Sequence, residues 1–323
     1  MLYPLMFQPI FKERVWGGRR MEQLYAKPLP PGVPIGESWE ITDRPEGVSV
    51  VSNGPLAGQT LRWLMENHAR ELLGGAKSQG GRFPLLVKIL DAQEKLSLQV
   101  HPPAGLAQSL GGEPKTEMWY ITDAAPDAEI FVGLKRGVTR AEFERRVQDG
   151  TVAQCFHRHA VHAGDSMFLP SGRVHALGAG PVLFEIQQNS DTTYRVFDWN
   201  RVGLDGKPRE LHVAQALASI DFTDFEPPLV SAPVKSVNGC DVQRLVDDAL
   251  FTVELSELPA GGVIERDDSV MQVIGVVNGA LRARGGGQEV MLKPGAFCLL
   301  PAECANTVIE SSAGATFLCA EAN

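Results

Sequence analysis

Two short segments of the chain combine side chains that could bind a metal ion. One is Leu-Ser-Leu-Gln-Val-His-Pro, in which Ser97, Gln99 and His101 alternate with apolar residues. Because successive side chains of a strand point to opposite faces, these three would share one face. The other is Lys-Thr-Glu-Met-Trp-Tyr, which places Lys115 and Glu117 together on one face of a second strand. An amide, an imidazole and a carboxylate would thus be available to one ion.

A third candidate segment ends at His175. It runs Gly-Asp-Ser-Met-Phe-Leu-Pro from Gly164 to Pro170 and continues Ser-Gly-Arg-Val-His. The spacing of its Gly, Pro, Gly and His resembles the second sequence motif of the cupins. Two imidazoles, a carboxylate and an amide oxygen suit Zn²⁺ with an open coordination position. The same ligands also suit Fe²⁺ or Mn²⁺, so the residue types predict a metal site and leave the element open.

The segments that would position these ligands are typical of an all-β protein. Runs rich in β-formers and bounded by turn residues predict strands over residues 85–90, 96–100, 118–122, 129–132, 166–169 and 182–187. Helices are expected only over residues 60–73, 139–148 and 208–219. The second of these begins with a capping box, Thr139 with Glu142 three residues on. Many short strands favour a jelly roll or barrel over an α/β sheet.

An internal repeat supports this interpretation. The segment Gly164–Pro170 is matched by Gly295–Pro301, in which Gly and Pro are again six positions apart. Five residues after the proline, the first copy has His175 and the second has Asn306. The repeat predicts two related units, of which the second has lost its metal ligand.

We therefore predict two cupin domains with the jelly-roll, double-stranded β-helix fold. Residues 1–230 would form the metal-binding catalytic domain, which includes the small helical segments. Residues 231–323 would form a degenerate cupin domain, and the proline-rich stretch 227–238 would hold the boundary. In the second unit, Asn-Gly at 278–279 between two apolar runs predicts a β-hairpin.

Composition excludes several classes of function. A formal net charge of −9 gives no global basic field, so neither nucleic acid nor an anionic membrane surface is expected as a partner. No apolar run is long enough to span a bilayer. The five cysteines form no Cys-x-x-Cys pair, and the N-terminal residues lack the features of a secretion signal, so we expect a cytoplasmic protein. The sequence makes no prediction of the oligomeric state.

Several stretches together resemble one family. They are Val15–Gly18 (Val-Trp-Gly-Gly), Gly36–Glu40 (Gly-Glu-Ser-Trp-Glu), Leu96–Pro102, Lys115–Glu117 and Asn189–Arg195 (Asn-Ser-Asp-Thr-Thr-Tyr-Arg). These stretches resemble those of type I mannose-6-phosphate isomerase and occur in the same order as in that family. The resemblance implies an aldose–ketose isomerase that interconverts mannose 6-phosphate and fructose 6-phosphate. It also implies one Zn²⁺ per chain, bound by Gln99, His101, Glu117 and His175.

The isomerisation moves a proton between C1 and C2 through an enediol-type intermediate, and the resemblance makes Arg195 the active-site arginine. A fixed guanidinium is suited to stabilising the oxyanion that develops on the carbonyl oxygen. Glu185 is expected either to transfer the proton or to orient Arg195. Lys88, near the ligand strand, is a further catalytic candidate.

An anionic substrate needs local positive charge in a protein that is acidic overall. Ser97 and Lys115 share strand faces with the proposed ligands, and Arg201 follows Arg195 by six residues. Similar positions in the family hold the phosphate, so these three are predicted to bind the sugar phosphate. Lys95, beside the ligand strand, is predicted to reach the sugar.

Two other functions use a similar set of residues. An Fe²⁺-dependent cupin oxygenase would consume oxygen, and it would leave Arg195 and Lys115 without a shared purpose. A non-catalytic sugar-phosphate sensor would keep the phosphate-binding residues, but it could dispense with Arg195 or with a metal ligand. This sequence retains both.

Overall fold

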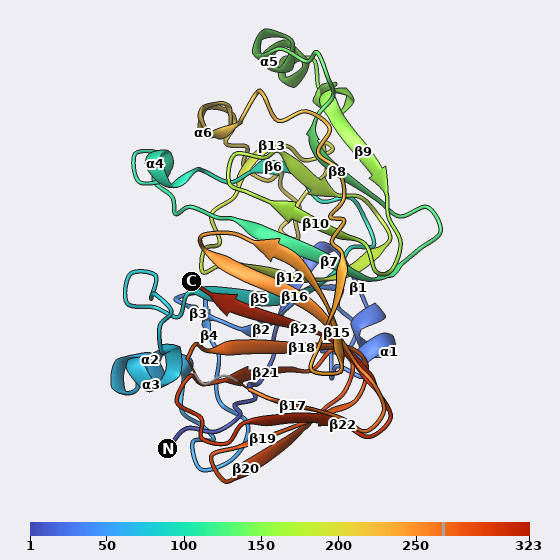
Figure 1. Ribbon diagram of the computed structural model, residues 1–323. Coiled ribbons are helices and arrows are strands. Elements are labelled where there is room, and N and C mark those ends of the chain that lie inside the picture. Colours follow the sequence, from blue (N-terminus) through green and yellow to red (C-terminus); the bar gives the residue numbers. More distant parts are fainter. Residues whose placement is uncertain (267–268) are drawn as a thin grey trace.

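The computed structural model describes residues 1–266 and 269–323. Within these residues most of the regular structure is strand, and the helices are few and short (Figure 1). The expectation of a mostly β protein is confirmed. No helix in the described part of the chain is long and apolar enough to cross a membrane.

The first part of the chain forms two main sheets. In order of pairing, the six-stranded sheet contains β1 (Ile10–Gly18), β2 (Ile35–Ile41), β5 (Leu85–Asp91), β12 (Pro181–Gln188), β7 (Glu117–Ala124) and β10 (Ser166–Leu169). The five-stranded sheet contains β13 (Tyr194–Phe197), β6 (Leu98–Val100), β11 (His175–Leu177), β8 (Glu129–Leu134) and β9 (Phe156–Ala160). A small separate ladder joins β3 (Asp43–Arg44) to β4 (Gly47–Val48).

The second part forms another pair of sheets. A second six-stranded sheet contains β14 (Val234–Val237), β15 (Cys240–Asp247), β16 (Phe251–Leu258), β23 (Ala315–Ala322), β18 (Gln272–Gly279) and β21 (Phe297–Leu300). The four-stranded sheet contains β17 (Gly262–Glu265), β22 (Val308–Ser311), β19 (Leu281–Gly285) and β20 (Gln288–Leu292).

The two parts repeat one strand order. The run β5-β12-β7-β10 corresponds to β16-β23-β18-β21, and β6-β11-β8-β9 corresponds to β17-β22-β19-β20, with equivalent strands in the same chain order. The repeated Gly–Pro segments coincide with equivalent strands, β10 and β21. His175 begins β11, and Asn306 lies just before the equivalent strand β22.

The helices lie in the connections between strands. They are α1 (Arg20–Tyr25), α2 (Leu61–Asn67), α3 (Ala69–Leu73), α4 (Ala104–Ala107), α5 (Arg140–Gln148), the 3₁₀ turn η1 (Val152–Cys155) and α6 (Val213–Ser219). The predicted cap of α5 is present, because Thr139 Oγ1 accepts a hydrogen bond from the Glu142 N–H at 3.2 Å.

Two sequence-based expectations about helices were wrong in detail. The segment 60–73 is two helices, since the backbone of His68 leaves the helical region with φ −139°. The segment 208–219 becomes helical only at Val213. Before it, Pro208 pairs with Val202, and the His212 N–H donates to the Arg195 carbonyl at 2.8 Å. These longer-range pairings compete with the helix at its N-terminal end.

The predicted hairpin at 278–279 was also wrong. β18 pairs with β21 and β23, whereas β19 pairs with β20 and β22. The turn therefore carries the chain from one sheet to the other. Gly279 has φ +75°, and a Cβ there would lie 2.2 Å from the Gly314 carbonyl oxygen. A hairpin turn and a crossing between sheets both need a glycine here, so the local sequence pattern could not distinguish the two.

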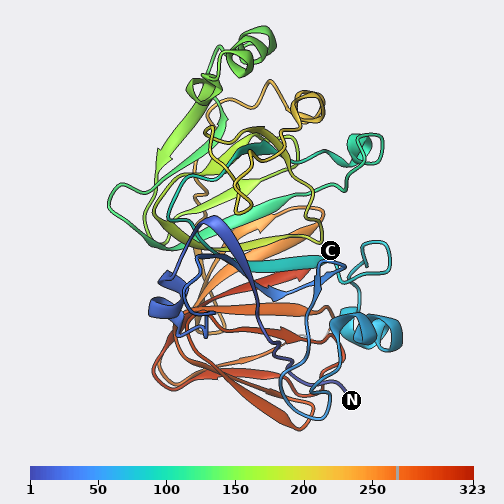
Figure 2. The ribbon, with the colours of Figure 1, turned by 180° about the vertical axis from the view of Figure 1, so that it is seen from behind.

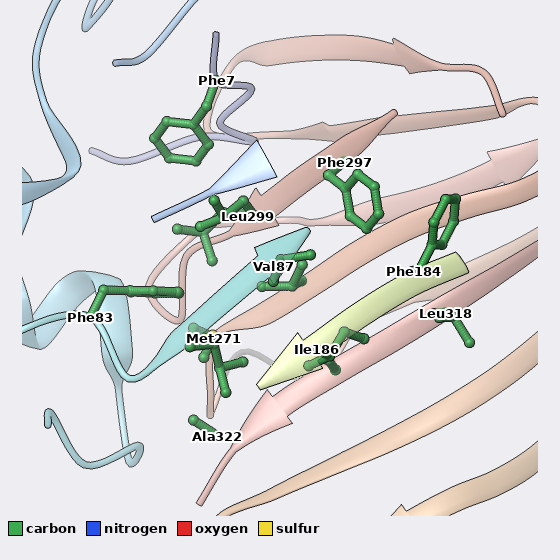
Figure 3. Close-up of a cluster of buried hydrophobic side chains, with 14 of the residues drawn as sticks. Phe7, Phe83, Val87, Phe184, Ile186, Met271, Phe297, Leu299, Leu318 and Ala322 are labelled. Atoms are coloured by element: carbon green, nitrogen blue, oxygen red, sulfur yellow. The ribbon is translucent and has the colours of Figure 1, made fainter. Parts of the chain in front are cut away.

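The largest hydrophobic cluster joins the two parts. β5 and β12 of one six-stranded sheet, through side chains such as Val87 and Phe184, contribute to the same buried cluster as β21 and β23 of the other (Figure 3). The Phe184 and Phe297 rings lie edge-on with centroids 4.9 Å apart. Leu5, near the N-terminus, exchanges two backbone hydrogen bonds with Leu299. The back view shows the N-terminal segment running along the second pair of sheets (Figure 2).

Candidate metal centre and active-site cavity

Three buried side chains converge between the sheets of the first part. Glu117 begins β7, His175 begins β11, and His101 directly follows β6, in which Gln99 pairs with His175. The possible ligand atoms of His101, Glu117 and His175 lie within 4.8 Å of one another. Each of these residues is at most 1% exposed. Strand register thus brings together residues that are far apart in the sequence.

Backbone carbonyls orient both imidazoles. His101 Nδ1 lies 2.7 Å from the Thr192 carbonyl oxygen, and His175 Nδ1 lies 2.9 Å from the Arg173 carbonyl oxygen. Because a carbonyl only accepts, each Nδ1 carries the proton and each Nε2 keeps a free lone pair. The Nε2 atoms of His101 and His175 face Glu117, at 3.4 Å and 3.3 Å from its carboxylate oxygens. Both rings are therefore set as neutral metal ligands.

The site fits a bound cation. Within the described residues, His101 Nε2 and Glu117 Oε1 are buried without a hydrogen-bond partner, an arrangement that costs free energy unless an ion uses these atoms. Burial, helped by Lys115, lowers the pKa of His101 to about 3, and burial also lowers the pKa of His175. Gln99 Nε2 lies 3.3 Å from His175 Nε2, and turning the amide over would direct Oε1 to the same place. Nitrogen, carboxylate and amide donors suit Zn²⁺, Fe²⁺ or Mn²⁺.

Lys115 lies directly beside the carboxylate of this group. Its Nζ is 2.5 Å from Glu117 Oε2, and its side chain is 4% exposed. Burial alone would raise the pKa of Glu117, but Lys115, His101 and His175 together outweigh burial and hold that pKa well below its usual range. Glu117 is thus ionised, as a ligand must be.

A cavity of about 480 Å³ opens beside the metal-binding group. Six of the sequence-predicted residues line it: Lys88, Ser97, Gln99, Lys115, Glu185 and Arg195. The volume is in the range of small-molecule sites. The strand alternation that placed Ser97 and Gln99 on one face therefore placed both at the cavity.

Lys88 is surrounded by carboxylates at the wall of this cavity. Its Nζ lies 3.2 Å from Glu185, 3.6 Å from Asp191 and 3.8 Å from Glu37. Burial alone would lower the pKa of Lys88, but Glu185 and Glu37 outweigh it and raise that pKa. The ammonium stays charged.

Glu185 has the properties of a proton-transfer group. Burial, and then the charge of Glu117, raise its pKa. The Trp119 indole N–H donates to Oε2 at 2.9 Å, while Oε1 has no hydrogen-bond partner in the described part of the chain. A carboxyl group with a raised pKa can hold and release a proton nearer to neutral pH.

Arg195 lies on β13, opposite Gln99 of β6. Its Nε is buried and has no hydrogen-bond partner among the described residues. Burial, and then the neighbouring charge of Arg209, lower its pKa from 12.5. It lines the cavity, and no carboxylate of the described residues forms an ion pair with it.

Two predicted substrate-binding residues are not among those that line the cavity in the described structure. Arg201 pairs with Asp198 at 2.8 Å and with Glu94 at 3.8 Å. Lys95 pairs with Glu129 at 3.2 Å and lies over the Trp199 ring. Both are occupied by neighbours outside the cavity, which a sequence spacing does not reveal.

Sequence reasoning missed six charged residues that line the cavity in the described structure, namely Glu13, Arg14, Glu37, Asp191, Asp205 and Arg209. Glu37 and Asp191 belong to stretches that carried the family resemblance, so that signal could have identified them. Arg14 lies two positions before Trp16, just outside such a stretch. Arg209 lies in a loop without a recognisable motif, and its position gave no signal.

The chain is similar to known proteins over nearly all of its length. Residues 5–116 match the family described as phosphomannose isomerase type I, catalytic domain. A probable mannose-6-phosphate isomerase of Bacillus subtilis (GmuF) is 35% identical, over 97% of this chain and 98% of that protein. A mannose-6-phosphate isomerase of Streptococcus mutans is 37% identical, over 93% of each. A crystal structure of a mannose 6-phosphate isomerase from Bacillus subtilis superposes with a TM-score of 0.88 at 33% identity, covering 99% of both chains.

Proposed function

The chain belongs to the type I phosphomannose isomerase family, and we propose that it interconverts D-mannose 6-phosphate and D-fructose 6-phosphate. The observation that carries this proposal is the buried group of His101, Glu117 and His175 beside a cavity lined by several cations. Such a cavity can accept a small anion in a protein of net charge −9.

We assign one Zn²⁺ per chain to this group, with His101, Glu117, His175 and the side-chain oxygen of Gln99 as ligands. The unpartnered Nε2 and carboxylate oxygen support the assignment. When bound, the ion supplies a Lewis acid that polarises or orients the sugar oxygens without a change of redox state.

The protein residues supply the remaining chemistry. Glu185, whose pKa is raised, is assigned the transfer of a proton between C2 and C1 of the open-chain sugar. Lys88, 3.2 Å from Glu185, keeps that carboxyl group in place and balances its charge. Arg195 is assigned the stabilisation of the oxyanion of the enediol-type intermediate. A cation that is already in position at a partly buried site stabilises such a negative charge more strongly than water does.

Ser97 and Lys115 are assigned to substrate binding, since both line the cavity beside the ligands. Arg201 is assigned an indirect part, since its partner Asp198 also holds the cavity-lining Arg209, and no substrate contact is assigned to Lys95, whose partner Glu129 does not line the cavity in the described structure.

We further propose that the two pairs of sheets are two cupin jelly rolls, residues 1–230 and 231–323. The shared strand order supports this division. The second unit would be structural, because Asn306 stands where the first unit has His175. Cys155, Cys240, Cys298, Cys304 and Cys319 form no disulfide within the described residues, and a cytoplasmic location remains part of the proposal.

A coupled assay for fructose 6-phosphate tests the function. Purified protein is supplied with mannose 6-phosphate before chelation, after chelation, and after Zn²⁺ is added back. Activity that chelation abolishes and Zn²⁺ restores supports both the reaction and the metal. No activity in the metal-loaded protein would reject the proposed reaction.

A further inference from the structure

The connection between β13 and α6, residues 198–212, forms one wall of the cavity. Gly203, Leu204, Asp205 and Arg209 of this loop line it. The loop is tethered at both ends, since the Trp199 indole N–H donates to the Leu96 carbonyl at 2.7 Å and the His212 N–H donates to the Arg195 carbonyl at 2.8 Å. The wall is therefore anchored to the sheet that carries Gln99 and Arg195.

Within this loop, Arg209 is held by a nearly buried carboxylate. Its Nε and Nη2 donate to the two oxygens of Asp198, each at 2.6 Å. Arg201 donates to the same carboxylate at 2.8 Å, and Asp198 is 5% exposed. Two guanidinium groups thus share the Asp198 carboxylate, and Arg201 has a second, more distant carboxylate partner in Glu94 at 3.8 Å. The two hydrogen bonds to Asp198 fix the plane of the Arg209 guanidinium, and Nη1 takes part in neither of them.

The other cations of the cavity are already matched by carboxylates. Lys88 has three carboxylates within 3.8 Å, Lys115 has Glu117 at 2.5 Å, and Arg14 Nε has Glu37 at 2.7 Å. Among the described residues, Arg195 forms no ion pair, and the carboxylate that pairs with Arg209, Asp198, does not line the cavity. Asp205, the carboxylate of the same wall, already accepts a hydrogen bond from the Lys207 N–H at 3.0 Å.

Two neighbouring guanidinium groups that face a cavity repel each other unless an anion lies between them. The lowering of the Arg195 pKa by burial and by Arg209 reflects this repulsion. A phosphate dianion at Arg209 would weaken this repulsion and would accept charge-assisted hydrogen bonds from Arg209.

We propose that Arg209 binds the phosphate of the substrate, while Arg195 serves the reacting end of the sugar, and that Asp198 and Arg201 position Arg209 for this contact. The proposal rests on the proposed function and adds a residue that determines specificity for phosphorylated sugars. It also revises the role of Arg201, from a direct phosphate ligand to a positioning residue.

The test compares Arg209→Gln with Lys207→Gln in the zinc-loaded protein. Lys207 lies on the same loop but does not line the cavity within the described residues, so its variant controls for the loss of a loop charge. KM and kcat for mannose 6-phosphate are measured together with the inhibition constant of inorganic phosphate. Zinc stoichiometry and the thermal midpoint establish that each variant is folded.

Arg209→Gln is expected to raise KM and the phosphate inhibition constant by a similar factor of roughly ten to a hundred, the effect of one lost hydrogen bond between charged groups. Its kcat should stay within about threefold, because Arg209 does not act on the reacting carbons. Lys207→Gln should leave all three quantities near the wild-type values. Arg209→Lys, which keeps the charge but loses the bidentate pair, should recover part of the affinity.

Unchanged KM and phosphate inhibition in folded Arg209→Gln would overturn the inference, as would a fall in kcat with KM unchanged. Arg201→Gln should raise KM less than Arg209→Gln does, and the reverse order would make Arg201 the direct ligand. Wild-type protein without isomerase activity would reject the proposed function instead. In that case binding of inorganic phosphate to wild type and to Arg209→Gln, measured by calorimetry, still decides whether Arg209 forms an anion site.

Discussion

Replacing Lys88 with Met should destabilise the protein strongly and in a way that depends on pH. Lys88 is 3% exposed and lies between Glu37, Glu185 and Asp191. Methionine fills a similar volume but leaves these carboxylates without their common cation. Removal of one partner of a buried ion pair costs about 3–5 kcal/mol, and we expect a loss of this size at pH 7.

The electrostatic environment of Glu37 supports the same expectation. Burial alone would raise the pKa of Glu37, but Lys88 and Arg14 outweigh it and lower the pKa from 4.5 to about 2. This lowering of the Glu37 pKa corresponds to about 3 kcal/mol of folding stability, to which both cations contribute. Because the folded-state pKa is the lower one, the contribution is present above pH 4.5 and is lost as the pH falls towards 2.

The pH dependence of the variant follows from Glu185. Its pKa is already raised in the folded protein, and loss of Lys88 would raise it further. A raised carboxyl pKa destabilises the folded state at pH values above it, where the group must be ionised, and does so less as the pH falls. The stability difference between wild type and Lys88→Met should therefore be larger at pH 8 than at pH 5.

The assay is urea unfolding of both proteins in the presence of chelator at pH 5, 6, 7 and 8. Lys95→Met is the matched control, because Lys95 is 39% exposed and pairs with Glu129 at 3.2 Å. An exposed pair contributes at most about 1 kcal/mol, so this control should lose little stability at any of these pH values. A loss below about 1 kcal/mol for Lys88→Met, or an equal loss at pH 5 and pH 8, would refute the reasoning.

Three further predictions concern the site. Arg195→Ala should lower kcat by about a hundredfold or more, because it removes a group that stabilises an oxyanion. The zinc content should stay unchanged, and a near-normal rate would remove Arg195 from the mechanism. His101→Ala should lose zinc and activity together, because it removes a buried ligand, and stoichiometric zinc measured in the purified variant would contradict the ligand set. Arg44→Gln should weaken zinc binding by up to about tenfold, although Arg44 contacts no ligand. Arg44 donates to the Asn189 carbonyl at 3.0 Å and so holds the loop in which the Thr192 carbonyl orients His101. A zinc dissociation constant equal to that of wild type would exclude this support.

The sequence predicted the local parts of this protein well. Alternation along Ser97, Gln99 and His101 placed them on one face, and Ser97 and Gln99 do line the cavity. Turn residues marked the strands, and the capping box marked the start of α5. These features depend on residues close together in the chain, whose types decide backbone geometry directly.

The predictions that were wrong concern segments whose structure depends on partners distant in the sequence. The Asn-Gly turn at 278–279 is a crossing between sheets, which depends on where β23 and β21 pair. The helix before Ser219 starts late because His212 bonds to Arg195.

For the site, residue types and spacing predicted a metal-binding group, and the family resemblance predicted its ligand set and the reaction. The tertiary structure alone decided which charges face the substrate: Arg209 lines the cavity, whereas Arg201 pairs with Asp198 and Glu94 outside it. Strand alternation fixes the direction of a side chain through the backbone of its own segment. The direction of a long side chain in a loop depends on how the loop folds back on itself and on distant partners, here Asp198 of the same loop and Glu94 of another segment, and strand alternation does not encode either.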